Sequence, residues 1–263
     1  MCRILFATGE GRAVIPLLEG LVRASGNDPY KEKRGKGREH RDGWGYLLIK
    51  NGSVRHYRSM TPLFKDGDAL ETLRGELHGF VTLMVHARAA SQGSKDLFNV
   101  QPLAFSSRHG FTFWLIHNGD LDKSRIMNLA ELDAEELERA SDTYAFATYL
   151  CRRLQNPTPE ELLLHYRRGA EATRSLFNTA GIFHLSSGDF VAFLTAKMGD
   201  NYIRDPLSYD YGKLLLLRRE NLFAVASSTV GLYYRAEYDV VPNNTAFYVR
   251  IGRESFYVKS LHL

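Results

Sequence analysis

Short apolar runs separated by turn signals fill most of the 263-residue chain, and they predict more strands than helices. Residues 2–8, 80–88 and 111–117 have the length and apolar character of buried strands. Residues 43–50 and 53–59 flank Asn51-Gly52, a strong hairpin signal. Further runs of this kind cover 181–187, 189–196, 213–219, 222–228, 245–252 and 254–260, with turns at 187–189 and 220–221.

Helical spacing predicts helices over residues 13–25, 67–78, 132–154 and 159–177. In the segment 132–154, three acidic residues lie early and two arginines lie late, which favours a helix through its dipole. Ser141-Asp142-Thr143 interrupts that segment, so a second helix capped by Ser141 or Asp142 is an alternative. The acidic residues are Glu135, Glu136 and Glu138, and the arginines are Arg152 and Arg153.

This order of elements predicts an α+β fold. Strands come as adjacent antiparallel hairpins, and a central pair of helices separates them into groups. The chain is 44% hydrophobic, and its length suits one large domain or two small ones. There is no internal repeat or low-complexity linker, so we expect one domain over residues 1–263. No Rossmann or phosphate-loop pattern is present.

The location predicted from the sequence is the cytoplasm. No apolar run approaches the ~20 residues that cross a bilayer, and the N-terminus lacks the apolar region of a signal peptide. The two cysteines, Cys2 and Cys151, do not form a disulfide framework. Cys151 falls in a predicted amphipathic helix and is expected in the core.

The net charge of +4 comes mainly from one basic segment, residues 31–41. With two glycines and no apolar periodicity, this segment is predicted to be a solvated loop, and it could form a flap over a pocket. Without any nucleic-acid-binding motif, it does not favour a DNA or RNA partner. The nine histidines lack paired ligand spacing, so the sequence predicts neither a metal nor a cofactor.

Cys2 follows the initiator methionine, which makes it a candidate nucleophile. Removal of Met1 would leave one residue with both a free α-amine and a thiol. The amine could act as the base that activates the thiol, as in N-terminal Thr and Cys hydrolases. The alternative is that a small second residue carries no function.

Other candidate residues lie at strand ends or at a helix start. Arg88 ends the strand 80–88 and suits a carboxylate, or a structural salt bridge. Asn118-Gly119 follows the strand 111–117 and predicts a turn, which could also form an oxyanion hole. Asp142 could cap a helix or accept hydrogen bonds from a substrate ammonium.

Taken in order, these motifs resemble those of class II glutamine amidotransferases, which belong to the N-terminal nucleophile hydrolases. The resemblance covers roughly residues 2–230 and is most similar to the stand-alone branch. Gln101 departs from that branch, where histidine is usual, and Tyr144 stands where an acidic residue often occurs. The motifs are Cys2, HxDGWG at 40–45, HxR at 86–88, HNG at 117–119 and Ser141-Asp142.

The resemblance implies a four-layer αββα fold with two antiparallel sheets. It also implies that Cys2 is the nucleophile, that Asn118 and Gly119 form the oxyanion hole, and that Arg88 holds an α-carboxylate. Trp44 would support the pocket wall.

Asp120 and Asp142 would then face the substrate ammonium. The implied reaction cleaves the side-chain amide of glutamine, or of a γ-glutamyl compound, through a thioester. The alternatives are a glutaminase subunit that delivers ammonia to a separate synthase, and a non-catalytic member of the family.

Overall fold

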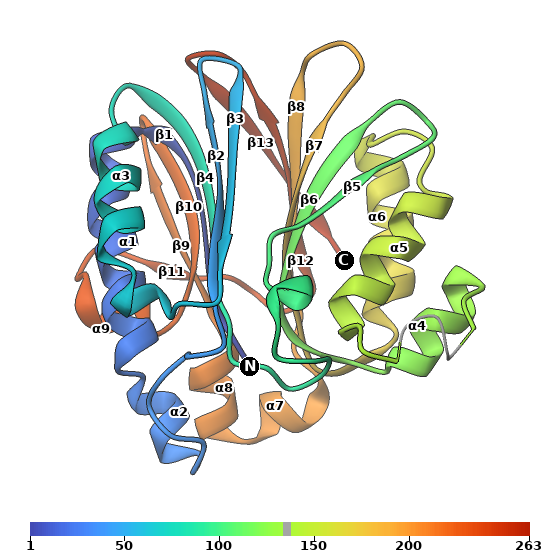
Figure 1. Ribbon diagram of the computed structural model, residues 1–263, viewed down its shortest axis with the longest axis horizontal. Helices are drawn as coiled ribbons and strands as arrows, with labels where there is room; N and C mark the ends of the chain where they lie inside the picture. The colour runs from blue at the N-terminus through green and yellow to red at the C-terminus, as the bar shows by residue number, and fades with distance from the viewer. Residues whose placement is uncertain (134–137) are drawn as a thin grey trace.

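Two antiparallel sheets face each other with helices on both outer sides, in a computed structural model that describes residues 1–133 and 138–263 (Figure 1). The layers run helix, sheet, sheet, helix, so the predicted α+β fold class with four layers is confirmed. The N-terminus lies at one end of the gap between the sheets, above helices α7 and α8.

Within the described residues, the first sheet has seven strands in the order β11-β9-β10-β1-β4-β2-β3. All neighbouring strands in it are antiparallel, and β1 lies at its centre, paired with β10 and β4. The strands are β1 (Arg3–Glu10), β2 (Trp44–Lys50), β3 (Ser53–Ser59), β4 (Phe80–Ala87), β9 (Leu214–Arg219), β10 (Leu222–Ser227) and β11 (Asp239–Val240).

The second sheet has six strands in the described part of the chain, in the order β13-β12-β8-β7-β6-β5. Its strands are also antiparallel to their neighbours. They are β5 (Leu103–Ser106), β6 (Thr112–Leu121), β7 (Thr173–His184), β8 (Phe190–Ala196), β12 (Thr245–Ile251) and β13 (Phe256–His262).

Helices α1 (Gly11–Gly26) and α3 (Gly67–Glu76) cover the outer face of the first sheet. Helices α4 (Lys123–Ala130), α5 (Asp142–Arg153) and α6 (Pro159–Ala170) cover the second. No helix in residues 1–133 and 138–263 is long and apolar enough to span a membrane. The shorter helices are α2 (Pro29–Lys33), α7 (Asp200–Arg204), α8 (Pro206–Gly212), α9 (Val230–Tyr233), η1 (Leu63–Lys65) and η2 (Leu97–Asn99).

The core consists of three apolar layers, one between the sheets and one under each helical layer. Strand β1 shows why: Ile4 and Phe6 point into the gap between the sheets, whereas Leu5 and Ala7 face the helices. Because both faces are buried, residues 4–7 of the strand are apolar without alternation, and this run predicts the strand correctly.

Two predicted helix boundaries differ from the structure. The prediction of a helix over 159–177 is wrong beyond Ala170, because Thr173 begins β7, which pairs with β6. In the segment 132–154, the alternative of a second helix is confirmed: α5 begins at Asp142, and the Ser141 hydroxyl accepts the Tyr144 N–H at 3.2 Å. Glu135 and Glu136, which supported the longer helix, lie outside the described residues.

The basic segment 31–41 is more structured than predicted. Its start belongs to α2, and His40 near its end is fully buried. The Arg34 guanidinium donates to the Ser208 hydroxyl of α8 at 2.6 Å and lies 4.7 Å from the centre of the Tyr202 ring. The prediction of a solvated loop therefore holds only in part: most of the segment is exposed, but Arg34 packs against α8, near the end of the molecule that holds the N-terminus.

Candidate functional site

Cys2 lies directly before β1 and is buried, with 8% of its surface exposed. Its backbone N–H donates to the Asn118 Oδ1 atom at 2.8 Å, and Asn118 belongs to β6 of the other sheet. The Cys2 Sγ atom accepts the Ala89 N–H at 3.4 Å, directly after Arg88. Residues far apart in the sequence thus meet at one end of the gap between the sheets.

Asn118 and Gly119 do not form a turn, so that interpretation is wrong. Strand β6 continues to Leu121, with an irregularity in its pairing after Gly119. A Cβ atom at Gly119 would lie 1.8 Å from the Leu176 carbonyl oxygen, so only glycine fits there. The position is specified by a close approach to β7 rather than by a reversal of the chain.

The Asn118 amide has an unused donor. Its Nδ2 atom is buried and has no hydrogen-bond partner among the residues that the structure describes. Buried amide groups are nearly always paired, so an unpaired one requires an explanation. Because the same side chain holds the Cys2 backbone, this donor lies close to Cys2 and can donate to a ligand oxygen.

Arg88 is buried without a carboxylate partner in the described part of the chain, which argues against the structural salt bridge. Its Nη2 atom donates to the carbonyl oxygens of Ser94, at 2.9 Å, and Gln92, at 3.4 Å. Its Nη1 atom is buried and unpaired within the described residues. One side of the guanidinium is therefore fixed by the chain, and the other is free for an anion.

The two acidic candidates flank Leu121. Asp142 accepts the Leu121 N–H at 2.7 Å and the Thr143 N–H at 2.9 Å. Burial raises the pKa of Asp142 above its ordinary value. Asp120 accepts from the Gln92 side chain at 2.5 Å, and that same amide donates to the Leu121 carbonyl at 2.8 Å.

A buried polar network next to Cys2 was missed by the sequence analysis. Arg3 donates through Nε to Asp28 at 2.6 Å, and the His40 Nε2 atom lies 2.9 Å from the same carboxylate oxygen. Burial lowers the pKa of His40 to about 4, so at neutral pH it donates as a neutral ring. Burial alone would raise the pKa of Asp28, but Arg3 and His40 outweigh it and hold that pKa below its usual range. The sequence held one sign of this network: Arg3 is a charged residue within the apolar run 2–8.

The two departures from the expected motifs have structural roles. Gln101 accepts the His117 N–H at 2.6 Å and donates to the Thr143 hydroxyl at 3.0 Å, which ties β6 to α5. Tyr144 packs against Phe98, with ring centres 4.7 Å apart. Neither residue is one of the groups that contact Cys2 or Asn118.

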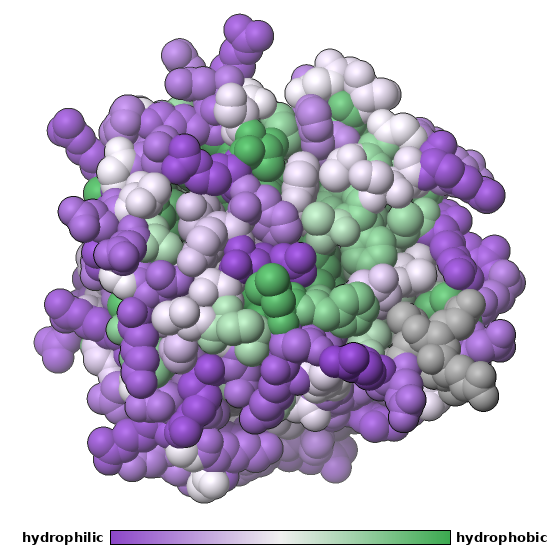
Figure 2. All heavy atoms as spheres, in the orientation of Figure 1, coloured by the Kyte–Doolittle hydropathy of each residue, from purple (hydrophilic) through white to green (hydrophobic). Residues whose placement is uncertain are grey.

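Trp44, which was expected to support the pocket wall, lies behind the first sheet. It is fully buried in the layer between the first sheet and its helices, and its ring N–H donates to Asp66 at 2.9 Å. The segment after Arg88 accepts from the Arg88 guanidinium through the Gln92 and Ser94 carbonyl oxygens and then carries η2, drawn teal in the middle of Figure 1. Leu97 and Phe98 of η2 are exposed, and Figure 2 shows apolar side chains gathered in the middle of this face.

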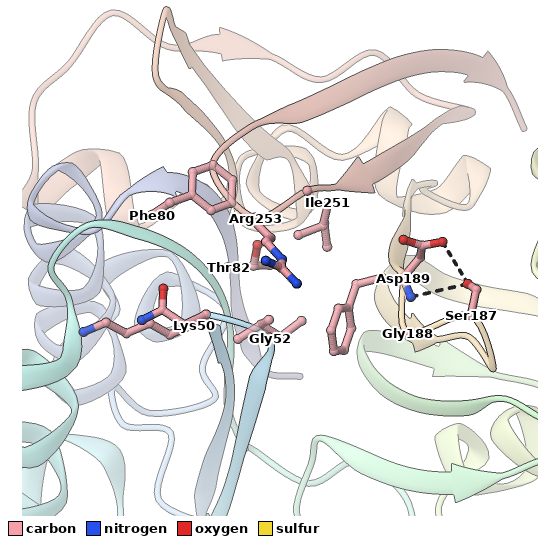
Figure 3. Close-up of a pocket in the computed structure, with 13 residues that line it drawn as sticks. Lys50, Gly52, Phe80, Thr82, Ser187, Gly188, Asp189, Ile251 and Arg253 are labelled. Atoms are coloured by element: carbon pink, nitrogen blue, oxygen red, sulfur yellow. Dashed lines mark hydrogen bonds between the residues drawn. The ribbon is translucent and has the colours of Figure 1, made fainter.

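A separate cavity of about 300 Å³ lies at the opposite end of the sheets (Figure 3). It is lined by the β2–β3 turn, by Thr82 and by Arg253, among others. Thr82 pairs with Thr8, six residues along β1 from Cys2, which is roughly 20 Å. The cavity lining contains no thiol, so this cavity is distinct from the site at Cys2.

Comparison with known proteins identifies the fold. No protein-family model matches the sequence, and no curated protein matches it. Among solved structures, the chain is similar to glutamine phosphoribosylpyrophosphate (PRPP) amidotransferase from B. subtilis, in complex with ADP and GMP, with a TM-score of 0.62 and 15% identity. The chain has a glutamine amidotransferase fold.

This similarity extends over almost the whole chain. It covers 98% of the residues here and 49% of the B. subtilis protein. An allosteric regulatory enzyme of purine biosynthesis matches with the same TM-score, 17% identity and 48% coverage of its own chain. The chain thus spans about half the length of these two proteins. A glutamine aminotransferase class-II domain protein from Silicibacter pomeroyi aligns with a TM-score of 0.49.

Proposed function

We propose that residues 1–263 act as one glutamine amidotransferase domain that hydrolyses the side-chain amide of glutamine or of a γ-glutamyl compound. Cys2 is the nucleophile once Met1 has been removed. The observation that carries this proposal is the Asn118 side chain, which accepts from the Cys2 backbone at 2.8 Å and keeps a buried amide donor unpaired. A thiol beside an unused donor is the arrangement that acyl transfer requires.

The free α-amine of Cys2 acts as the base in this reaction. Burial lowers the pKa of the Met1 α-amine, and we expect the same of an amine at the adjacent Cys2. A lowered pKa increases the fraction of the amine that is unprotonated at neutral pH, which favours transfer of the thiol proton to it. Both cysteines are free thiols, and a reducing cytoplasm, as predicted, would keep them so.

The chemistry then proceeds in two steps. The Cys2 sulfur attacks the amide carbon, and the carbonyl oxygen becomes an oxyanion that the Asn118 Nδ2 and the Gly119 N–H stabilise. The C–N bond breaks as the ammonium of Cys2 returns its proton to the leaving nitrogen, releasing ammonia or an amine. Water, deprotonated by the same amine, hydrolyses the thioester to glutamate and regenerates the thiol.

Recognition of the glutamyl group follows from the charges around the thiol. The unpaired Nη1 side of Arg88 binds the α-carboxylate. Asp120 and Asp142 face the α-ammonium, since both carboxylates keep lone pairs beyond their present donors. An incoming ammonium would lower the raised pKa of Asp142, which couples substrate binding to its ionisation.

The test compares the two cysteines of the chain. After intact mass has confirmed the loss of Met1, ammonia and glutamate release from glutamine is measured for wild type, Cys2→Ala and Cys151→Ala. We expect Cys2→Ala to abolish release. We expect Cys151→Ala to retain it, because Cys151 belongs to helix α5, in the helical layer on the outer face of the second sheet. Equal release by wild type and Cys2→Ala would refute the proposal.

A second candidate function is delivery of ammonia to a separate synthase. The matched proteins include one named for glutamine together with PRPP, and this chain spans about half its length. This role predicts that glutamine hydrolysis accelerates when the synthase and its acceptor substrate are added. Rates that do not change on addition of the synthase would count against it.

A further inference from the structure

The N-terminus lies at the end of the molecule where α7 and α8 lie (Figure 1), and the Met1 side chain is partly buried against Leu176, Met198 and Tyr202, in a space that we call the recess. Its sulfur accepts from the hydroxyls of Ser175 and Tyr202, both at 3.4 Å. Its carbonyl oxygen accepts the Tyr211 hydroxyl at 2.8 Å. The first residue thus occupies a defined site with partners for both its backbone and its side chain.

The position of this recess relative to the reacting atoms follows from the Cys2 nitrogen. That nitrogen is joined to the Met1 carbonyl carbon at about 1.3 Å, and its hydrogen points to Asn118 Oδ1. In the proposed reaction the same nitrogen gives a proton to the leaving amine, which must come within about 2.6–3.2 Å of it. Asn118 fills one direction around this nitrogen, and loss of Met1 opens the direction that its carbonyl carbon now fills, which gives the leaving amine a path to the nitrogen.

The lining of the recess is apolar with three hydroxyls. The Met1 side chain packs against a buried cluster of Leu176, Met198 and Tyr202. Near the Met1 sulfur, Arg34 already donates to the Tyr202 hydroxyl at 2.8 Å and to Ser208, whereas Lys31 and Lys36 lie near the Met1 α-amine. Where the Met1 side chain lies, the recess therefore suits an uncharged side chain, because a charged one would be buried against this apolar cluster.

We propose that this recess is the binding site for the amine half of the substrate, and that it selects γ-glutamyl amides of apolar amino acids over glutamine. The inference rests on the proposed function and specifies its substrate. The Tyr211 hydroxyl, which now holds the Met1 carbonyl, binds the carboxylate of the released amino acid. The site that holds Met1 in the unprocessed chain thereby becomes a substrate site after processing.

The experiment compares three substrates on the protein with Met1 removed: γ-glutamyl-methionine, γ-glutamyl-glutamate and glutamine. Burial of a methionine side chain corresponds to a gain of about 10- to 100-fold in kcat/KM. We expect γ-glutamyl-methionine to exceed glutamine by that factor. We expect γ-glutamyl-glutamate to fall below γ-glutamyl-methionine, because its side-chain carboxylate would lose water against the apolar cluster that packs the Met1 side chain.

A substitution that fills the recess gives an independent measurement. Ser175→Leu places a larger apolar side chain where the Met1 sulfur now lies. We expect it to lower the ratio of kcat/KM for γ-glutamyl-methionine to that for glutamine by about tenfold or more. Ser53→Leu makes the same change on the exposed edge strand β3, and we expect it to leave this ratio as in wild type.

The outcomes separate this inference from the function on which it rests. If glutamine turnover depends on Cys2 but γ-glutamyl-methionine is no better a substrate, the recess does not select the amine half and the inference fails alone. If Ser175→Leu lowers both activities equally, the recess does not discriminate between amine halves, and the inference fails. If none of the substrates shows Cys2-dependent turnover, the proposed function fails as well.

Discussion

Asn118→Ala should separate catalysis from stability, and Asn178→Ala provides a matched control. The two asparagines are paired across β6 and β7, and each is 1% exposed. They differ in how their amides are used. Asn178 donates to the Gly212 carbonyl at 2.7 Å and accepts the Lys197 N–H at 3.2 Å. Asn118 accepts one backbone N–H, and its donor is unpaired in the described part of the chain.

The expected magnitudes follow from this difference. In Asn118→Ala, the Cys2 N–H loses its acceptor, which costs about 1–3 kcal/mol. The substitution also removes the buried, unpaired Asn118 donor, and this stabilises the folded state by a similar amount. The free energy of unfolding should therefore change by about 1 kcal/mol or less. In Asn178→Ala, two backbone groups lose partners, so the cost is about 2–4 kcal/mol. The loss of an oxyanion donor in Asn118→Ala should lower kcat by about 10²- to 10³-fold.

Urea unfolding and steady-state glutamine hydrolysis measure the two quantities on the same preparations. We expect Asn118→Ala to be stable and inactive, and Asn178→Ala to be destabilised and active. A fall in kcat of less than about tenfold for Asn118→Ala would contradict the oxyanion role. A loss of stability equal to that of Asn178→Ala would show that the unpaired Asn118 donor does not destabilise the folded state.

Three further substitutions test other parts of the structure. Arg88→Lys should raise KM for glutamine about 10-fold, because a lysine lacks the planar fork, and initial rates measure this. Gly119→Ala should cost about 3 kcal/mol or more in urea unfolding, because its Cβ would overlap the Leu176 carbonyl oxygen. His40→Asn should remove a pH dependence of the free energy of unfolding. Burial lowers the pKa of folded His40 to about 4, so the unfolded state binds this proton at higher pH than the folded state does. Wild type should lose about 3 kcal/mol more than the variant between about pH 7 and pH 4.

Local sequence signals were sufficient where local geometry decides the structure. Asn51 and Gly52 both have positive φ angles, 52° and 77°, as their hairpin signal requires. The helix over 159–177 was extended too far because residues 171–177 continue the apolar spacing. That stretch is strand from Thr173 because it pairs with β6, and a long-range pairing leaves no sign within the segment itself.

The sequence analysis named candidate site residues but not the contacts that hold them. Cys2 donates a hydrogen bond to Asn118 across the two sheets. Arg88 and Asp142 are buried, and each keeps hydrogen-bonding capacity that a substrate could use. These residues came from the order of motifs. The partners of Asp28 and His40 could not be predicted in this way, since only the fold brings them to Arg3.

The position of Cys2 is fixed from both sides, and this bears on the consequence of losing Met1. A newly exposed terminal residue ordinarily frays unless its neighbours tie it down. Here Arg3 follows Cys2 and is fully buried, with Nε on Asp28 at 2.6 Å and Nη1 on the Tyr211 carbonyl at 2.8 Å. Pulling Arg3 out would leave Asp28 as an uncompensated buried charge, which costs about 3–5 kcal/mol. Removal of Met1 therefore frees the Cys2 amine without freeing the Cys2 backbone, so the thiol stays beside Asn118.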